Sequence, residues 1–156
     1  MLKRKIEKTL LNWLNTENRN PLILKGCRQC GKTFSVLRFA QQHYKQVVYL
    51  NFFENPDYRT IFEGSLKVDD VVLMMSAFVG ANVRFIPHET VIVLDEIQEC
   101  PRARAALKFF KLDGRFDVLA TGSLLGISGY RSEDYSVPVG YETIIDMFPL
   151  DFEEFL

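Results

Sequence analysis

The stretch GCRQCGKT, at positions 26–33, decides the fold. It matches in full the pattern GxxxxGK followed by Ser or Thr, with Gly26 and Gly31 as its glycines and Lys32 and Thr33 at its end. In a phosphate-binding loop, the glycines let successive backbone N–H groups point at phosphate oxygens, and the dipole of the following helix adds positive potential. The sequence therefore predicts a loop that holds the phosphates of a nucleotide.

The motif also predicts which residues contact the nucleotide and its metal. We expect Lys32 to reach the β- and γ-phosphates and the hydroxyl of Thr33 to bind Mg²⁺. The alternative is an ordinary turn that contains glycine, but an apolar strand, PLIL, precedes the motif and a helical pattern follows it, as a phosphate loop requires. The residues predicted to bind the nucleotide are Gly26, Cys27, Arg28, Gln29, Cys30, Gly31, Lys32, Thr33 and Phe34.

A second motif, VIVLDE at positions 91–96, is an apolar run that ends in two carboxylates. A strand of this kind places its acids at the carboxyl edge of the sheet, where ligands bind in open α/β folds. We expect Asp95 to hold Mg²⁺ through water and Glu96 to orient or deprotonate the attacking water. Buried strands often end in acids without any function, but the position after a phosphate loop, with one strand between, favours the catalytic interpretation.

A third segment, ATGS at positions 120–123, ends the next apolar run in small polar residues. Thr121 or Ser123 could donate a hydrogen bond to the γ-phosphate or to the attacking water, and we take Ser123 as the third catalytic candidate. A strand-to-loop turn that contains glycine explains the same residues equally well, so both interpretations stay open.

Several other polar residues have simpler explanations. Cys27 and Cys30 form a C-x-x-C pair, but both occupy variable positions of the phosphate loop. We therefore attribute the pattern to coincidence and expect no redox role. The two histidines, His43 and His88, have no metal-ligand spacing.

Several basic residues are candidate contacts for phosphate or for a partner. Arg104, Lys108 and Lys111 recur at helical spacing, which favours a solvated helix face over a stripe that meets DNA or a subunit. Arg28 and Arg131 are candidates for an arginine that contacts phosphate or acts in trans.

The remaining pattern indicates an α/β domain. Apolar runs at 22–24, 47–52, 91–94, 118–120 and 144–148 are typical of buried strands, and helical patterns separate several of them. Strands that alternate with helices form a parallel sheet with right-handed crossovers. Before the sheet, the spacing of apolar residues predicts an amphipathic helix over 3–15. Positions 55–90 are too long for a plain loop and predict a small helical insert, with a buried helix at 69–79.

Composition places the chain among single-domain globular proteins. It has 156 residues, a net charge of -1 and 47% hydrophobic residues. Its near-neutral charge does not favour a dedicated nucleic-acid binder, although one basic face is compatible with it. Three cysteines do not favour a disulfide framework. No apolar run is long enough for a membrane span and no export signal is visible, so we expect a cytoplasmic protein with no membrane contact.

Four segments together resemble one family, and they run through nearly the whole chain. They are PLILKGCRQCGKT, PHETVIVLDEIQECPRA, LATGSLLG and VPVGYETIIDMFPLDFEEFL. The combination resembles the AAA-type ATPases of bacteria and archaea whose ATPase core precedes a carboxy-terminal domain of unknown function. The resemblance implies ATP rather than GTP, Mg²⁺ as cofactor, and roles for Lys32, Thr33, Asp95 and Glu96.

The resemblance also completes the predicted architecture. It implies a P-loop three-layer sandwich with a mainly parallel five-stranded sheet. In that sheet the strand before the phosphate loop (Walker A) and the strand that ends in the acidic pair (Walker B) are not adjacent. The helical insert would precede the Walker B strand, and residues 1–156 would form the ATPase core without the family's carboxy-terminal domain. Expected partners are ATP, a second copy through the nucleotide face, and a DNA or protein partner through that absent domain.

The expected function is an ATP-binding and ATP-hydrolysing domain that couples nucleotide state to an output domain. One alternative is a nucleotide-gated switch with little turnover of its own, because a missing trans arginine can cost about 10³–10⁵ in rate. Another is a small-molecule kinase, which the adjacent carboxylates and the lack of an acceptor signature do not favour. A third is a DNA-associated module that uses ATP only for assembly.

Overall fold

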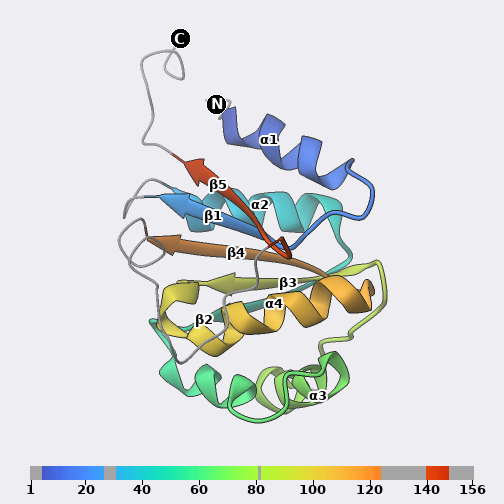
Figure 1. Cartoon of the computed structure of the whole chain (residues 1–156), viewed down its shortest axis with the longest axis vertical. Coiled ribbons are helices and arrows are strands. Elements are labelled where there is room, and N and C mark those ends of the chain that lie inside the picture. The colour runs from blue at the N-terminus through green and yellow to red at the C-terminus, as the bar shows by residue number, and fades with distance from the viewer. Residues whose placement is uncertain (1–4, 27–30, 81, 124–139, 148–156) are drawn as a thin grey trace.

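The computed structural model describes residues 5–26, 31–80, 82–123 and 140–147, and its centre is one parallel sheet (Figure 1). The five strands lie in the order β2-β3-β4-β1-β5, and all neighbouring pairs are parallel. Their bounds are β1 (Leu22–Gly26), β2 (Gln46–Asn51), β3 (Thr90–Asp95), β4 (Asp117–Ser123) and β5 (Thr143–Met147). The predicted fold class is therefore confirmed, and β4 separates the strand of the phosphate loop from the strand of the acidic pair, as expected.

Helices cover both faces of the sheet and make it the middle of three layers. On one face, α1 (Lys5–Leu14) and α2 (Lys32–His43) share a core with the sheet through residues such as Leu10 and Val36. On the other, α3 (Val68–Val79) and α4 (Pro101–Asp113) pack through residues such as Met75 and Leu107. Figure 1 shows α4 and α2 on opposite sides of the strands.

The central strand β3 explains why the acidic pair sits where it does. All six of its residues are buried, because helices cover both faces. Side chains alternate along a strand, so Val91 and Val93 belong to the core on the α2 side, whereas Ile92 and Leu94 belong to the core on the α4 side. Asp95 continues the first set, and its side chain therefore faces the helix that begins at the phosphate loop.

The predicted helical insert lies between β2 and β3. It consists of a 3-10 helix, η1 (Pro56–Phe62), followed by α3, which begins one residue before the predicted start. Two arginines connect the insert to the rest of the domain. Arg102 of α4 donates hydrogen bonds to the carbonyl of Phe62 at 2.5 Å and to that of Gly64 at 2.7 Å. Arg115 forms an ion pair with Asp69 at 2.5 Å.

The solvated-face interpretation of the basic residues on α4 is wrong for Arg104. Its side chain is only 8% exposed and forms an ion pair with Glu142 at 3.0 Å. Lys108 lies over the ring of Tyr141, with 5.6 Å between its Nζ and the ring centroid, and Lys111 donates to the carbonyl of Asn18. Helical spacing shows which residues share a face, but not what covers that face.

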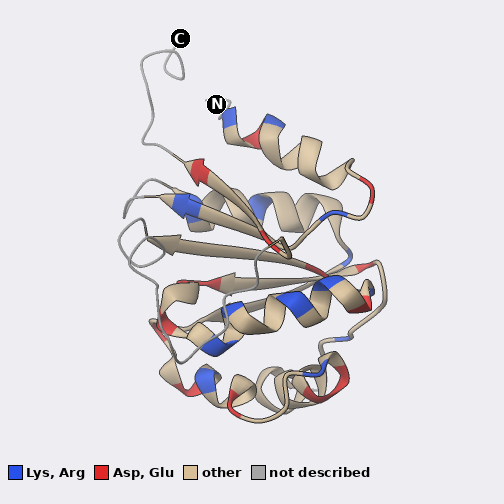
Figure 2. Ribbon diagram, viewed as in Figure 1, with Lys and Arg blue, Asp and Glu red and all other residues tan. Residues whose placement is uncertain are grey.

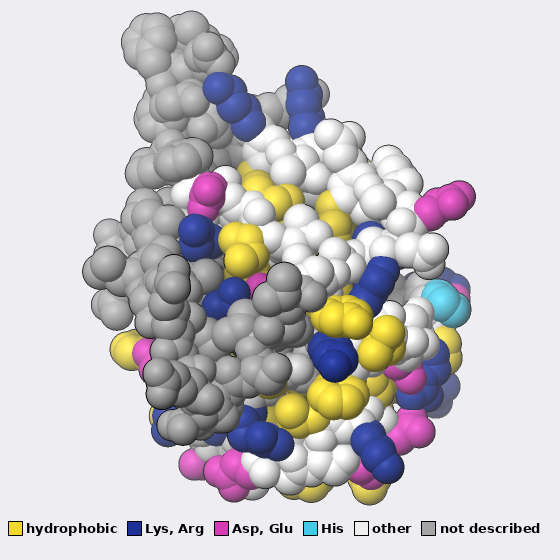
Figure 3. Space-filling view, in the orientation of Figure 1, with side chains coloured by type: hydrophobic (Ala, Val, Ile, Leu, Met, Phe, Trp, Pro, Cys, Tyr) yellow, Lys and Arg dark blue, Asp and Glu magenta, His cyan; other side chains and the backbone are white. Residues whose placement is uncertain are grey.

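On the side that displays α4, the described residues mix charges of both signs (Figure 2). Figure 2 shows basic residues along α4 with acidic residues on neighbouring segments, and Figure 3 shows hydrophobic side chains between them. Within the described residues, no helix combines the length and the apolarity that crossing a membrane requires.

Candidate nucleotide-binding site

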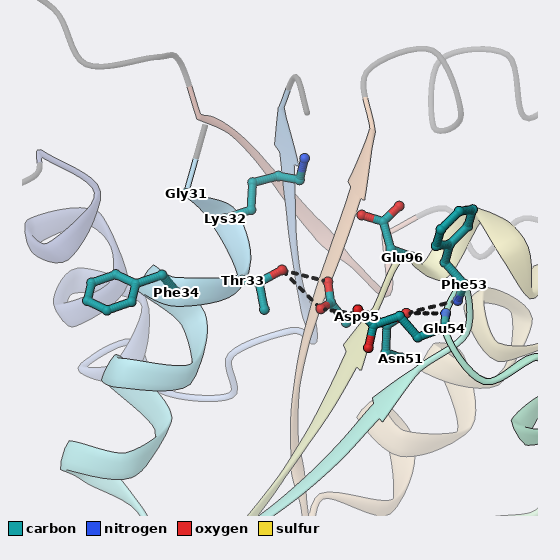
Figure 4. A pocket seen from close by; sticks show the side chains of 9 residues that line it. All are labelled: Gly31, Lys32, Thr33, Phe34, Asn51, Phe53, Glu54, Asp95 and Glu96. Atoms are coloured by element: carbon teal, nitrogen blue, oxygen red, sulfur yellow. Dashed lines mark hydrogen bonds between the residues drawn. The ribbon is translucent and has the colours of Figure 1, made fainter. Parts of the chain in front are cut away.

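A cavity of about 350 Å³ lies at the carboxyl edge of the sheet (Figure 4). It opens between the start of α2 and the ends of β2 and β3, where side chains from both motifs converge. Its lining residues are Gly31, Lys32, Thr33, Phe34, Asn51, Phe53, Glu54, Asp95 and Glu96. Six of these were predicted as site residues from the sequence, so two motifs more than sixty positions apart in the chain meet in one cavity.

The described part of the phosphate loop has the backbone conformation that its glycine pattern implies. Gly31 has φ 87° and ψ 18°, a left-handed conformation that favours glycine, and α2 begins directly after it. Lys32 is buried, and its Nζ donates a hydrogen bond to the carbonyl of Gly26 at 3.1 Å. The ammonium group is therefore held close to the end of β1. The predicted contacts Cys27, Arg28, Gln29 and Cys30 lie outside the described residues, as does Arg131.

Asp95 lies at the centre of a hydrogen-bond cluster beneath the cavity. Its side chain accepts from Thr33 at 3.0 Å on Oδ1 and 2.9 Å on Oδ2, so the two motifs contact each other directly. Thr121 also donates to Oδ1, and Tyr49 donates to Oδ2. Asn51 adds a longer hydrogen bond of 3.3 Å to Oδ2. Asp95 is 1% exposed, and four neutral side chains together satisfy its carboxylate.

The parallel register brings these donors together. Asn51 of β2 is the partner of Asp95 in the ladder, and Tyr49 lies two residues earlier on the same face of that strand. Thr121 belongs to β4, the neighbour of β3 on its other side. Asp95 is consequently contacted from both adjacent strands, and from α2 above the sheet through Thr33.

Tyr49 contacts Asp95 as a protonated donor. Burial and, after it, the hydrogen bond to Asp95 raise the pKa of Tyr49 well above its usual range. The phenol therefore keeps its proton at neutral pH. Its oxygen also accepts a hydrogen bond of 3.2 Å from the side-chain amide of Asn51.

Glu96 has a backbone conformation that is rare outside glycine. Its φ of 60° and ψ of 51° are left-handed, and such conformations in non-glycine residues cluster at functional sites. Its backbone N–H donates to Thr121 Oγ1 at 3.0 Å. Its carboxylate accepts a hydrogen bond of 2.6 Å from the side-chain amide of Gln98. The turn thus directs Glu96 into the cavity while Asp95 stays beneath it (Figure 4).

The two hydroxyl residues considered as γ-phosphate contacts occupy different places. Thr121 is fully buried and bonds both members of the acidic pair. Ser123 is partly exposed at the end of β4, where its backbone N–H donates to the Oε1 of Gln98 at 3.3 Å. In the ladder, Ser123 is the partner of Gly26 at the start of the phosphate loop. Ser123 is not among the lining residues of the cavity.

The residues that sequence reasoning missed come from β2 and from the turns after β2 and β3. They are Tyr49, Asn51, Phe53, Glu54 and Gln98. The only signal for the first two was that YLN ends an apolar run, with Tyr49 and Asn51 on one face. That signal becomes useful only when β2 is known to lie beside β3.

The residues at the cavity fit a magnesium ion. Mg²⁺ prefers oxygen ligands, and proteins commonly hold it with one or two carboxylates together with substrate phosphates and water. Thr33 offers a hydroxyl oxygen and Asp95 a carboxylate at the same point. In the described ranges, no group of three or more His, Cys, Asp or Glu side chains could hold a metal by itself. The donor set therefore suits a metal that arrives with a phosphate ligand.

Fold and site together define the class of this protein. Two features are typical of a P-loop nucleotide-binding protein. One is a glycine loop that joins a strand to a helix, and the other is an acidic pair at the end of a parallel strand that is separated from the first by one further strand. The family model of the AAA domain matches residues 18–156. The chain belongs to this AAA family, and its general function is that of a nucleotide-binding ATPase domain. The comparison with curated proteins found no match.

Proposed function

We propose that the chain binds Mg-ATP in the cavity at the carboxyl edge and hydrolyses its γ-phosphate bond. The observation that carries this proposal is the contact between Thr33 and Asp95, at 2.9 and 3.0 Å, on the floor of the cavity. It joins the proposed metal-binding hydroxyl to the proposed metal-binding carboxylate, each delivered by its own motif.

Three residues hold the triphosphate and its metal in this proposal. The ammonium of Lys32, now bonded to the carbonyl of Gly26, would bind the β- and γ-phosphates. Thr33 and Asp95 would hold Mg²⁺, with Asp95 acting through water. When bound, the metal would neutralise charge that develops on the phosphate oxygens.

Glu96 is the proposed general base. Its carboxylate lines the cavity next to the metal-binding side chains, and the hydrogen bond from Gln98 fixes its position. It would accept a proton from the water that attacks the γ-phosphate, or would orient that water. Ser123 is the proposed γ-phosphate contact, because Thr121 is already bonded to Asp95 and to the backbone of Glu96.

A slow intrinsic rate is also part of the proposal. No arginine lines the cavity among the described residues. An arginine supplied in trans can contribute about 10³–10⁵ to the rate of phosphoryl transfer. A second copy at the nucleotide face would be one source of it. Coupling to an output domain, and through it to DNA or protein, belongs to the same proposal.

The test compares the parent with Glu96→Gln in two assays. Calorimetry gives the affinity for ATP, and single-turnover release of labelled phosphate gives the hydrolysis rate even when it is slow. We expect the amide to leave affinity nearly unchanged and to lower the rate by about 10²–10⁴. Equal rates in the two proteins would remove Glu96 as the base. Tight binding without any turnover by the parent, alone or at high concentration, would instead support the nucleotide-gated switch.

A further inference from the structure

Tyr49 makes a contact that the proposed roles of the two motifs do not require. It lies inside β2 and packs against the core on the α2 side, where its ring is partly buried. Its hydroxyl extends from that apolar surface to Oδ2 of Asp95. A phenylalanine would fill the same core position, so packing alone does not explain the hydroxyl.

The phenol is held in place from a second side. The amide of Asn51 donates to the Tyr49 oxygen at 3.2 Å and to Oδ2 of Asp95 at 3.3 Å. The orientation of that amide is itself fixed, because its oxygen accepts hydrogen bonds of 2.9 Å from the backbone N–H groups of both Phe53 and Glu54. Tyr49 can therefore donate its only proton to Asp95 while its oxygen is satisfied by Asn51.

The terminal torsion of an aspartate is broad, so a carboxylate at a metal site turns easily unless donors fix it. Thr121 fixes Oδ1 and Tyr49 fixes Oδ2 of Asp95. Thr33 is bonded to both oxygens, but its hydroxyl is also the proposed metal ligand. Tyr49 is thus the hydroxyl donor to Oδ2 whose bond does not have to change when a metal binds.

We propose that Tyr49 is a positioning residue for the metal: its hydroxyl holds the Asp95 carboxylate in the orientation that binds Mg²⁺ with the nucleotide. This inference rests on the proposed function, because it assumes that Asp95 serves the metal. Partners in the outer sphere of a metal site typically contribute about 10–100-fold to metal affinity.

The test measures how much Mg²⁺ strengthens binding of a non-hydrolysable ATP analogue, by calorimetry in Mg²⁺ and in EDTA. Tyr49→Phe keeps the ring and removes the hydroxyl. We expect it to reduce the Mg²⁺ enhancement by about tenfold and to leave affinity in EDTA unchanged. Tyr44→Phe is the matched control, since Tyr44 also donates to an aspartate, Asp117, at 2.5 Å. It should lower the melting temperature similarly without changing the enhancement.

A double mutant separates positioning from a general effect on the fold. In an Asp95→Asn background, Tyr49→Phe should cause no further loss of the Mg²⁺ enhancement, because its partner is already changed. An unaltered enhancement in Tyr49→Phe, or an equal loss in Tyr44→Phe, would overturn the inference. If the parent does not bind the analogue at all, the proposed function fails first, and this outcome is distinct from the other two.

Discussion

Each end of the parallel strands holds an aspartate beside a tyrosine, buried at the carboxyl edge and partly buried at the amino edge, and the two ends balance its charge differently. At the amino end of β4, Asp117 accepts hydrogen bonds from Nε and Nη2 of Arg19, at 3.1 and 2.5 Å, as well as from Tyr44. At the carboxyl end of β3, Asp95 accepts only from neutral groups in the part of the chain that is described.

This difference supports the proposal that Asp95, unlike Asp117, serves a metal. A buried charge is usually paired with an opposite charge or used to coordinate a metal. The chain supplies a cation for Asp117, which closes that cluster. For Asp95 the described residues supply hydrogen bonds from neutral groups, and under the proposal its negative charge is balanced by the metal.

The largest effect is expected from Lys32→Ala. The substitution removes the ammonium that would balance phosphate charge, and it breaks the hydrogen bond from Lys32 to the carbonyl of Gly26. We expect ATP affinity to fall by at least about a hundredfold, because each tenfold loss corresponds to about 1.4 kcal/mol of binding free energy. The fold should stay intact. Calorimetry and circular dichroism measure the two quantities.

Lys45→Ala is the control from the opposite edge. Lys45 precedes β2 and is 75% exposed, with an ion pair to Glu89 at 3.0 Å. Its loss should leave both affinity and fold unchanged, because exposed pairs contribute little. A folded Lys32→Ala protein that binds ATP as the parent does would contradict the assignment of the phosphate loop.

The second prediction concerns the amino edge, where Arg19→Met should destabilise the fold without affecting nucleotide binding. Arg19 bonds Asp117, donates to the carbonyl of Leu14 at 3.0 Å and lies over the Trp13 ring. Losing a hydrogen bond to a charged group costs about 1.5–3 kcal/mol, and we expect a loss of this size in the free energy of unfolding. Urea denaturation measures it. An accompanying change in ATP affinity would mean that the two edges are not independent.

The smallest effect is a pH dependence at the amino edge. Burial and, next, the hydrogen bond to Asp117 raise the pKa of Tyr44 well above its usual value. Above about pH 10 the unfolded chain loses this proton while the folded chain keeps it, so stability falls as pH rises, by up to about 1.4 kcal/mol per unit. Tyr44→Phe should flatten this decline.

The comparison of parent and variant isolates Tyr44. Burial also raises the pKa of Cys100, to about 11, and its contribution to the alkaline decline is present in both proteins. The stability advantage of the parent over Tyr44→Phe should therefore be constant up to about pH 9 and should shrink by about 1 kcal/mol by pH 11. Parallel curves throughout that range would show that Tyr44 does not titrate differently in the folded state.

The sequence could predict which segments meet at the carboxyl edge, because that edge is made of local signals. A glycine loop, an acidic pair after an apolar strand and small polar residues after the next strand can each be recognised within a few positions. Parallel strands then bring their carboxyl ends to one edge, so Thr33 and Asp95 could be expected to meet.

The rest depended on contacts between distant positions. Tyr49 became part of the site only through the pairing of β2 with β3, which no local pattern specifies. Arg104 was expected on a solvated helix face, but Glu142 approaches it from 38 positions away and covers it. The pairing of Arg19 with Asp117 spans 98 positions and was equally invisible.

The most direct test compares Asp95→Asn with Asp117→Asn by calorimetry of a non-hydrolysable ATP analogue, in Mg²⁺ and in EDTA. Both substitutions remove one negative charge from a hydrogen-bonded aspartate, one at each edge. We expect Asp95→Asn to abolish most of the Mg²⁺ enhancement of binding, and Asp117→Asn to lose stability but to keep the enhancement of the parent. If both variants keep the Mg²⁺ enhancement of the parent, Asp95 does not serve the metal and the cavity at the carboxyl edge is not the Mg-ATP site.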